Sequence, residues 1–391
     1  MHKARTALVI GGGIAGPVTA LALAEAGIRA TVHEARPAPA DGIGAMLTIA
    51  PNGLEALRTV GAHRAVQEVG HPVPSVALED GRGGRLSRFD GFPGLPPTLA
   101  MRRAELFRAL SDHAVARGVP LVHGSRLVGA ERTPRGVTAF FADGSTAEAD
   151  VLIGADGIRS TVRSLIDPGA PGPEYGGVLS FGGLVDEDPD SPVEPGVMHF
   201  GFGRAFLGHW RLPDGRVCWF AALPRTEPLT TAEVARVPAA DWLARLRELY
   251  AGHVPGEALI SRTRPEDLMA TGPMERVPSV PHWHRGPMVL VGDAVHAPSS
   301  SSGQGASLAV ESALELARCL RDLPVADAFA AYERLRRPRV EAVGRAAAAT
   351  NRAKAGAGSG AGSGTFALPD PERMFGHLHR FRVDWETAVR A

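Results

Sequence analysis

The sequence predicts a mixed α/β protein with α+β character, and three parts of it carry this prediction. Residues 5–34 run from an apolar strand through a glycine-rich turn into a helix and a second strand. Residues 176–223 carry Phe, Trp and Val at strand spacing, and residues 305–321 and 326–354 have helical patterns. We therefore expect a Rossmann-like domain interleaved with a β-sheet domain and closed by C-terminal helices.

The composition excludes several classes of function. The chain has 391 residues, and its 42 basic and 42 acidic side chains leave no net charge. A general nucleic-acid binder needs a basic excess, so we expect no nucleic-acid partner. Only Cys218 and Cys319 occur, which gives no cysteine metal site and no disulfide framework, and favours a reducing cytoplasm. We expect no metal centre.

The uncharged run at residues 7–24 follows a basic start and resembles a signal peptide or membrane span. Three consecutive glycines and Pro17 interrupt this run, and its pattern changes from strand-like to helix-like at the glycines. We therefore expect no membrane partner.

The βαβ unit is predicted in detail. A strand is expected at Thr6–Ile10, a helix at Ala15–Ala26 that ends at Gly27, and a second strand at Arg29–His33. Further along the chain, helices are expected at 53–69, 103–117 and 240–251, a hairpin at 136–153 with its turn at Asp143-Gly144, and a buried strand at 288–291.

The turn of the βαβ unit reads Gly11-x-Gly13-x-x-Gly16, and Glu34 follows the second strand. Such glycines permit a tight turn, a close approach of the backbone to a pyrophosphate, and close packing of helix on strand. The helix N-terminus offers free N–H groups to the phosphates, and a carboxylate about 20 residues later binds ribose. The segment therefore predicts a dinucleotide site, against the alternative of a simple turn between core elements.

Two further motifs decide which dinucleotide is expected. Residues 154–163 read GADGIRSTVR and residues 292–305 read GDAVHAPSSSSGQG, each after a strand. With the glycine motif and in this order, they resemble the FAD-dependent aromatic-hydroxylase-like monooxygenases, the p-hydroxybenzoate and salicylate hydroxylase superfamily. The resemblance spans roughly residues 5–345 and includes Pro51-Asn52-Gly53, Arg103-Ala104-Glu105-Leu106 and the segment from Tyr332 to Arg339.

The resemblance implies a single-component monooxygenase with non-covalent FAD, NADPH or NADH as transient co-substrate, and O2. Through a flavin C4a-hydroperoxide it would hydroxylate or epoxidise an apolar or aromatic small molecule. The alternative is an FAD-dependent reductase or dehydrogenase that transfers hydride without inserting oxygen. A non-enzymatic flavoprotein is a third possibility. A monomer or homodimer is expected.

Motif and resemblance together imply a set of cofactor-binding residues, in which Asp293 would bond a ribityl hydroxyl and the helix after Gly305 would face the flavin pyrimidine edge. The set is Gly11, Gly13, Ile14, Ala15, Gly16, Glu34, Ala35, Arg36, Gly44, Arg103, Val128, Asp156, Gly157, Gly292, Asp293, Gly303, Gly305 and Ala306.

Structural alternatives stay open at several of these positions. Asp293 could instead cap a helix, Asp156-Gly157 could form a simple turn, and Ser160 and Arg163 could make ordinary capping contacts. His296 is expected to be a packed structural histidine rather than an acid or base.

The substrate site is expected on the β-rich region, where one sheet face would line a pocket. His209 is the candidate for a catalytic base, with a sheet histidine on the outer face as its alternative. The pocket candidates are Phe181, Phe200, His209, Trp219 and Pro298.

These assignments define the expected domains. Residues 1–72, 99–170 and 276–345 would form the FAD-binding domain, and residues 73–98 and 171–275 the substrate domain. Residues 346–391 would form a C-terminal helical segment with a flexible Gly/Ala/Ser loop at 355–364. Three segments depart from the resembled pattern: Asp41 replaces an arginine before Gly42-Ile43-Gly44, Glu311-Ser312-Ala313 replaces Glu-Asp-Ala, and the serine run Ser299–Ser302 replaces a proline pair of some members.

Overall fold

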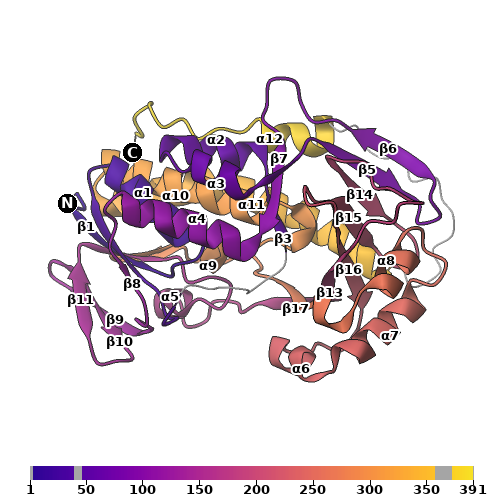
Figure 1. The fold of residues 1–391 in the computed structure, drawn as a ribbon. Coiled ribbons are helices and arrows are strands. Elements are labelled where there is room, and N and C mark those ends of the chain that lie inside the picture. The colour runs from indigo at the N-terminus through magenta and orange to yellow at the C-terminus, as the bar shows by residue number, and fades with distance from the viewer. Residues whose placement is uncertain (1–2, 39–45, 357–371, 391) are drawn as a thin grey trace.

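The computed structural model describes residues 3–38, 46–356 and 372–390, and it arranges them around two large sheets (Figure 1). The first sheet has the strand order β18-β19-β12-β1-β2-β8 and is parallel except at its β18 edge. The expected strands of the βαβ unit and the buried strand near residue 288 are thus confirmed. The strands are β1 (Thr6–Ile10), β2 (Arg29–His33), β8 (Leu121–Val122), β12 (Val151–Gly154), β18 (His284–Arg285) and β19 (Met288–Leu290).

Helices cover one face of this sheet, and a small antiparallel sheet covers the other (Figure 1). The apolar residues of both coverings join the strands in one large hydrophobic core. The helices are α1 (Ala15–Glu25), α4 (Arg103–Ala116) and α10 (Gly305–Asp322), and the small sheet consists of β9 (Leu127–Thr133), β10 (Gly136–Phe141) and β11 (Thr146–Ala149).

Two expected elements differ in extent from the prediction. The helix expected at 53–69 is two helices, α2 (Pro51–Thr59) and α3 (His63–Val69), because Gly61 between them has a φ of 71° and ends the first one. The expected hairpin forms between β10 and β11, but its last residues leave it for β12 of the large sheet.

The second large sheet has the order β17-β13-β16-β15-β14-β5-β6 and is antiparallel except where β14 runs parallel to β5. Helices α6 (Thr231–Arg236), α7 (Ala239–Leu249) and α8 (Gly256–Arg262) lie beside it (Figure 1). The strands are β5 (Ser75–Glu79), β6 (Arg85–Phe89), β13 (Glu174–Val185), β14 (Val197–Gly201), β15 (Leu207–Arg211), β16 (Val217–Pro224) and β17 (Leu268–Arg276).

The remaining elements connect the two sheets. A three-stranded sheet has the order β3-β7-β4, and α11 is a long helix with Pro338 inside it. The expected domain boundaries near 276 and 346 fall inside β17 and α11, so we keep the domain division as a proposal. These elements are β3 (Met46–Ile49), β4 (His71–Val73), β7 (Thr98–Arg102), α5 (Thr161–Ile166), η1 (Pro265–Asp267), α9 (Asp293–His296), η2 (Ser300–Ser302), α11 (Val325–Gly356), η4 (Glu372–Gly376) and α12 (His377–His379).

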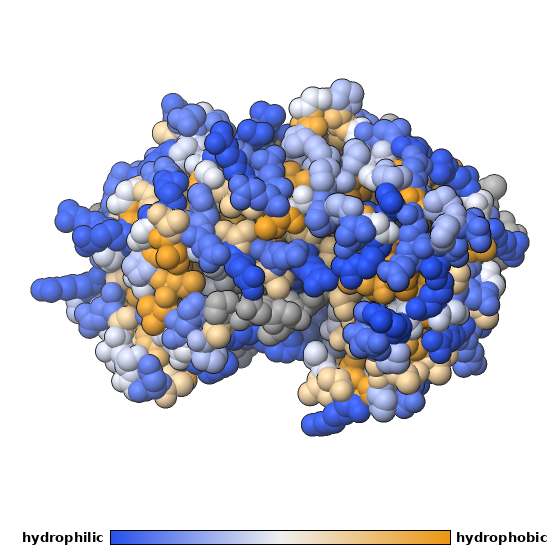
Figure 2. Space-filling model, in the orientation of Figure 1, coloured by the Kyte–Doolittle hydropathy of each residue, from blue (hydrophilic) through white to orange (hydrophobic). Residues whose placement is uncertain are grey.

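The outer surface in Figure 2 is mostly hydrophilic, with apolar residues in small groups, and a notch separates the halves that contain the two large sheets. Within the described residues, no helix is both long and apolar enough to cross a membrane. Apart from its first two residues, the loop expected at 355–364 lies outside the described residues.

Candidate cofactor and substrate site

The glycine-rich turn between β1 and α1 has the geometry that its motif predicts. A Cβ atom on Gly16 would lie 1.8 Å from the carbonyl oxygen of Gly11, so no side chain fits between turn and helix. A Cβ atom on Gly13 would meet nothing closer than Phe107 Cζ at 3.9 Å. The backbone is therefore open to a ligand at Gly13 and closed by packing at Gly16.

The N-terminus of α1 faces this open space. Ile14 is its N-cap residue, no side chain caps it, and its first turn contains no acidic residue. Its first N–H groups and positive dipole end are therefore available to an anion such as a pyrophosphate.

Glu34 lies beside the same turn at the end of β2. Its Oε2 accepts a hydrogen bond from Gly12 N–H (2.6 Å), and its Oε1 accepts one from Arg36 N–H (2.9 Å). Arg36 O in turn accepts from Gly124 N–H (2.8 Å), which brings the start of β9 and the exposed Val128 to this end of the sheet. Backbone contacts thus hold the Glu34 carboxylate where a ribose could bind.

Asp293 begins α9 but does not cap it. The N-cap residue is Gly292, and the Asp293 carboxylate forms no hydrogen bond within the described residues. Burial raises the pKa of Asp293, and the Arg103 guanidinium opposes this shift. An unpaired, half-buried carboxylate fits a hydroxyl ligand better than the capping alternative does.

The N-terminus of α10 also points into the site. Gln304 is its N-cap, and a buried network holds it from behind: Asn52 Nδ2 donates to Gln304 Oε1 (3.1 Å) and to Glu311 Oε1 (2.7 Å). Arg336 and Arg339 both donate to Glu311, at 2.7 and 2.8 Å. Burial opposes ionisation of Glu311, but the two guanidiniums lower its pKa below the ordinary value. The motif residues of α2 and α11 therefore position α10 rather than touch a ligand.

Asp156 has the structural role that the sequence left open. Its carboxylate accepts hydrogen bonds from Ser160 Oγ and from the N–H groups of Thr161 and Val162 at the start of α5. Arg163 donates to the carbonyl oxygen of Ala294 (2.8 Å). A cofactor contact of Asp156 stays a prediction.

His296 packs as the sequence analysis expected for a structural histidine. Its Nε2 lies 2.8 Å from Ser312 Oγ, and its ring is buried against Trp283.

One cavity of about 2850 Å³ connects the cofactor motifs to the second sheet. Ligand pockets usually have about 300–1,000 Å³, so this cavity has room for a dinucleotide and a substrate together. The predicted cofactor residues that line it are Ile14, Arg103, Gly157, Asp293, Gly303, Gly305 and Ala306. Gly44 lies outside the described residues.

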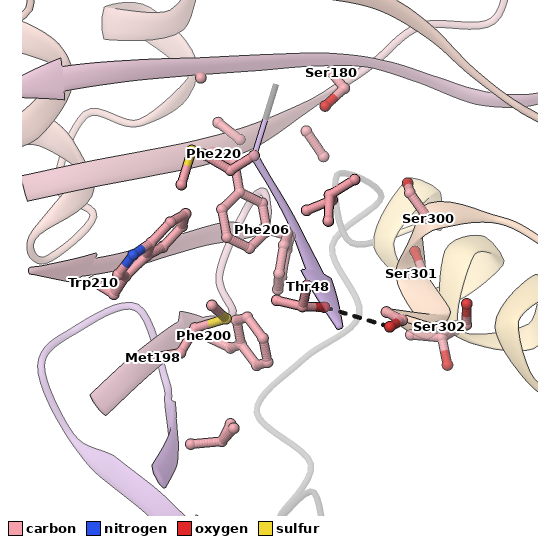
Figure 3. A pocket seen from close by; sticks show the side chains of 18 of the residues that line it. Thr48, Ser180, Met198, Phe200, Phe206, Trp210, Phe220, Ser300, Ser301 and Ser302 are labelled. Atoms are coloured by element: carbon pink, nitrogen blue, oxygen red, sulfur yellow. Dashed lines mark hydrogen bonds between the residues drawn. The ribbon is translucent and has the colours of Figure 1, made fainter. Parts of the chain in front are cut away.

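The far end of the cavity has two unlike walls (Figure 3). Met198, Phe200, Phe206, Trp210 and Phe220 form an apolar wall on the second sheet. The opposite wall carries hydroxyl groups, from Ser300, Ser301, Ser302 and Thr48, whose Oγ1 lies 3.4 Å from Gly303 O.

Phe181 and His209 are wrong as pocket residues because they lie on the other face of the sheet and outside the cavity lining, whereas Trp219 lines the cavity as predicted. Phe181 packs on Trp242, with ring centroids 5.0 Å apart, and Trp219 Nε1 donates to Thr263 Oγ1 (2.9 Å). Both belong to the core that the sheet forms with α7 and α8. Trp219 reaches the cavity lining, but its indole is fully buried in that core.

His209 stacks on His199, with ring centroids 4.7 Å apart, and is absent from the cavity lining. Burial lowers its pKa to about 3, so it is a poor base as well as a distant one. The outer-face alternative for this histidine is the one that the structure supports.

Phe200 and Pro298 do line the cavity, as predicted. Several other residues that line it were not predicted from the sequence. Side chains alternate between faces along a strand, so the position of Phe200 would have identified Met198 and, across the ladder, Phe220. No sequence signal marked the C-terminal contributors Phe375, His377, Leu378 and His379.

With this geometry described, comparison with known proteins identifies the family. The FAD binding domain family model matches residues 4–211 and 261–347. The chain belongs to this family. This membership confirms the resemblance found in the sequence.

Relatives of this FAD binding domain protein are FAD-dependent monooxygenases. It is 32% identical over 344 residues to aurachin C monooxygenase/isomerase of Stigmatella aurantiaca, with 86% of each chain covered. It is 31% identical over 348 residues to the FAD-dependent urate hydroxylase of Mycolicibacterium vanbaalenii, with 85% and 84% covered. Among solved structures, Klebsiella pneumoniae HpxO complexed with FAD and uric acid aligns with a TM-score of 0.78 and 28% identity, over 90% and 89% of the two chains.

Proposed function

We propose that the protein is a single-component FAD-dependent monooxygenase that uses NADPH or NADH and O2 to hydroxylate or epoxidise an apolar or aromatic small molecule. The observation that carries the proposal is the single cavity that extends from Ile14 at the start of α1, Asp293 and the α10 N-terminus to the aromatic wall. FAD, when bound, would accept hydride from NAD(P)H and, once reduced, would activate O2, as the resemblance implies.

The residues present fit FAD. The open backbone at Gly13 and the uncapped α1 suit its pyrophosphate, and the carboxylates of Glu34 and Asp293 suit hydroxyl groups of ribose and ribityl chain. The free N–H groups of α10 would stabilise negative charge on the flavin ring.

The two walls of the cavity indicate what the substrate region does. The aromatic wall of Phe200, Phe206, Trp210 and Phe220 would bind a planar apolar ring system and exclude water from it. The hydroxyl groups of the serine run would orient a polar substituent. With His209 on the opposite face, we propose that positioning rather than a side-chain base supports the reaction.

The deciding experiment follows NAD(P)H oxidation, O2 consumption and product formation under 18O2 with a panel of aromatic compounds. Substrate-stimulated O2 uptake with one labelled oxygen atom in the product supports the proposal. A reduced product without label would establish the reductase alternative instead. FAD binding with no stimulated NAD(P)H oxidation by any compound would favour the non-enzymatic flavoprotein.

Two further properties belong to this proposal. We keep the cytoplasm as the compartment, because Cys218 and Cys319 are both buried free thiols. We also keep a monomer or homodimer as the assembly, which gel filtration with light scattering would decide.

A further inference from the structure

A cluster of nitrogen and oxygen ligands lies on the face of the second sheet that is turned away from the cavity. Glu79 on β5, His199 on β14 and His209 on β15 each offer one ligand atom, and these atoms all lie within 4.8 Å of one another. The two histidines are directly opposite each other across the β14–β15 ladder. Three neighbouring strands thus supply the three groups.

The cluster has unused coordination capacity. Glu79 Oε1 lies 2.7 Å from His199 Nδ1, but His199 Nε2 and His209 Nδ1 are buried without a hydrogen-bond partner. The exposed fractions of the two histidines are 6% and 3%. Buried ring nitrogens are normally paired, so the unpaired His209 Nδ1, next to the Glu79–His199 pair, points to a missing partner.

From this geometry we infer that Glu79, His199 and His209 form a binding site for a divalent first-row transition metal ion, Zn²⁺ being the best match. Two imidazoles and one carboxylate are a ligand set that Zn²⁺ takes in proteins, with metal–ligand distances of about 2.0–2.2 Å. Such distances put the ligand atoms roughly 3.3 Å apart. Small side-chain rotations would exchange the Glu79–His199 hydrogen bond for two metal bonds.

A water molecule would complete the tetrahedron. Within the described residues, the group of ligand atoms that lie within 4.8 Å of one another contains only Glu79, His199 and His209. Because the site joins β5, which comes from residues 73–98, to β14 and β15, the ion would tie two separate segments of chain together. Its place behind the sheet assigns it a role in stability, not in the chemistry of the cavity.

The test uses FAD-loaded, tag-free protein, stripped with a chelator, reloaded with Zn²⁺, freed of excess metal and analysed by mass spectrometry. We expect about one zinc ion per chain in the native protein. His199→Gln and His209→Gln should each lower this to below about a tenth, with FAD content unchanged, because each removes a ligand. The matched control is His284→Gln, which alters another histidine paired with a glutamate (3.6 Å to Glu333) and should keep the zinc.

Two measurements on the native protein test the metal site even if a variant fails to fold. Co²⁺ added to stripped protein should give visible bands of a tetrahedral site, and Zn²⁺ should raise Tm in a concentration-dependent way. Native protein that takes up no zinc and shows neither response would overturn the inference, as would folded His199→Gln and His209→Gln variants that keep full zinc content. Neither result bears on the proposed oxygenation, because the flavin readouts are separate.

Discussion

The two large sheets of this protein present their proposed ligand-binding groups in different ways. In the first, the groups are mainly backbone N–H groups and short turns at strand ends and helix N-termini, as at Gly13, Ile14 and Gln304. In the second, they are side chains on one face of a sheet, such as Phe200 and Phe220. A site built from backbone groups depends on the geometry of its turn and is lost when that geometry changes. A site built from side chains can change its ligand preference when one of them is substituted.

The largest effect is expected from substitutions in the glycine turn, where backbone groups would bind FAD. Gly16→Val places side-chain atoms where even a Cβ lies 1.8 Å from Gly11 O, so we expect loss of stable folding and of bound FAD. Gly13→Ala meets no atom closer than 3.9 Å and should fold with the Tm of the FAD-stripped native protein, yet fail to bind FAD because its methyl group occupies the ligand's space. The measurement is FAD per chain from absorbance, with circular dichroism melting. If both variants kept full FAD, the turn would not be the cofactor site.

A second prediction contrasts two neighbours on opposite faces of the second sheet. Trp219 is fully buried against α7 and α8, so Trp219→Ala should lower the free energy of unfolding by about 3–5 kcal/mol. Phe220→Ala should instead raise the substrate KM by about 10- to 150-fold, because it removes apolar contact worth about 1.5–3 kcal/mol. Urea unfolding and steady-state kinetics give the two values. If Trp219→Ala instead raised KM and Phe220→Ala instead lowered the free energy of unfolding, our assignment of the two faces would be wrong.

A third prediction concerns the buried network behind α10. The Arg336 and Arg339 guanidiniums hold the pKa of Glu311 below its usual value, against the effect of burial. A lowered pKa in the folded state means that ionised Glu311 stabilises the fold above the unfolded pKa of about 4.3, and this contribution is lost as pH falls through the folded value.

Glu311→Gln should therefore cost about 3–5 kcal/mol at pH 7, because it leaves the buried Arg336 and the partly buried Arg339 without their anion. The difference from the native protein should shrink in acid, which urea unfolding at several pH values measures. A difference independent of pH would mean that packing, not charge, explains the loss.

The smallest effect is expected from a substitution of Asp293, a side chain at the proposed cofactor site. Asp293→Asn removes the charge that would accept a ribityl hydroxyl, at a cost of about 1.5–3 kcal/mol, or roughly 10- to 150-fold in the Kd for FAD. Asp241→Asn alters an exposed aspartate on α7 and serves as the control. Fluorescence titration of stripped protein with FAD measures both constants, and equal values for the two variants would remove Asp293 from the cofactor site.

The sequence by itself determined the βαβ unit, its glycine turn, Glu34 and the place of Asp293 after a buried strand. These are local features, because a turn of that tightness and a helix start of that kind are encoded within about 30 consecutive residues. Motif order along the chain added the family. The serine run at 299–302 was visible as a departure in sequence, but not as a wall of the cavity.

Only the tertiary structure decided which face of the second sheet meets the cavity. Neighbouring residues of a strand point to opposite faces. The faces on which Phe181, His209 and Trp219 lie could therefore be assigned only from the packing of α7 and α8 on one face of the sheet. The same reason hid the cluster of Glu79, His199 and His209, whose members are up to 130 residues apart in sequence. Pairing between strands that are distant in sequence creates such sites, and a local sequence pattern does not predict that pairing.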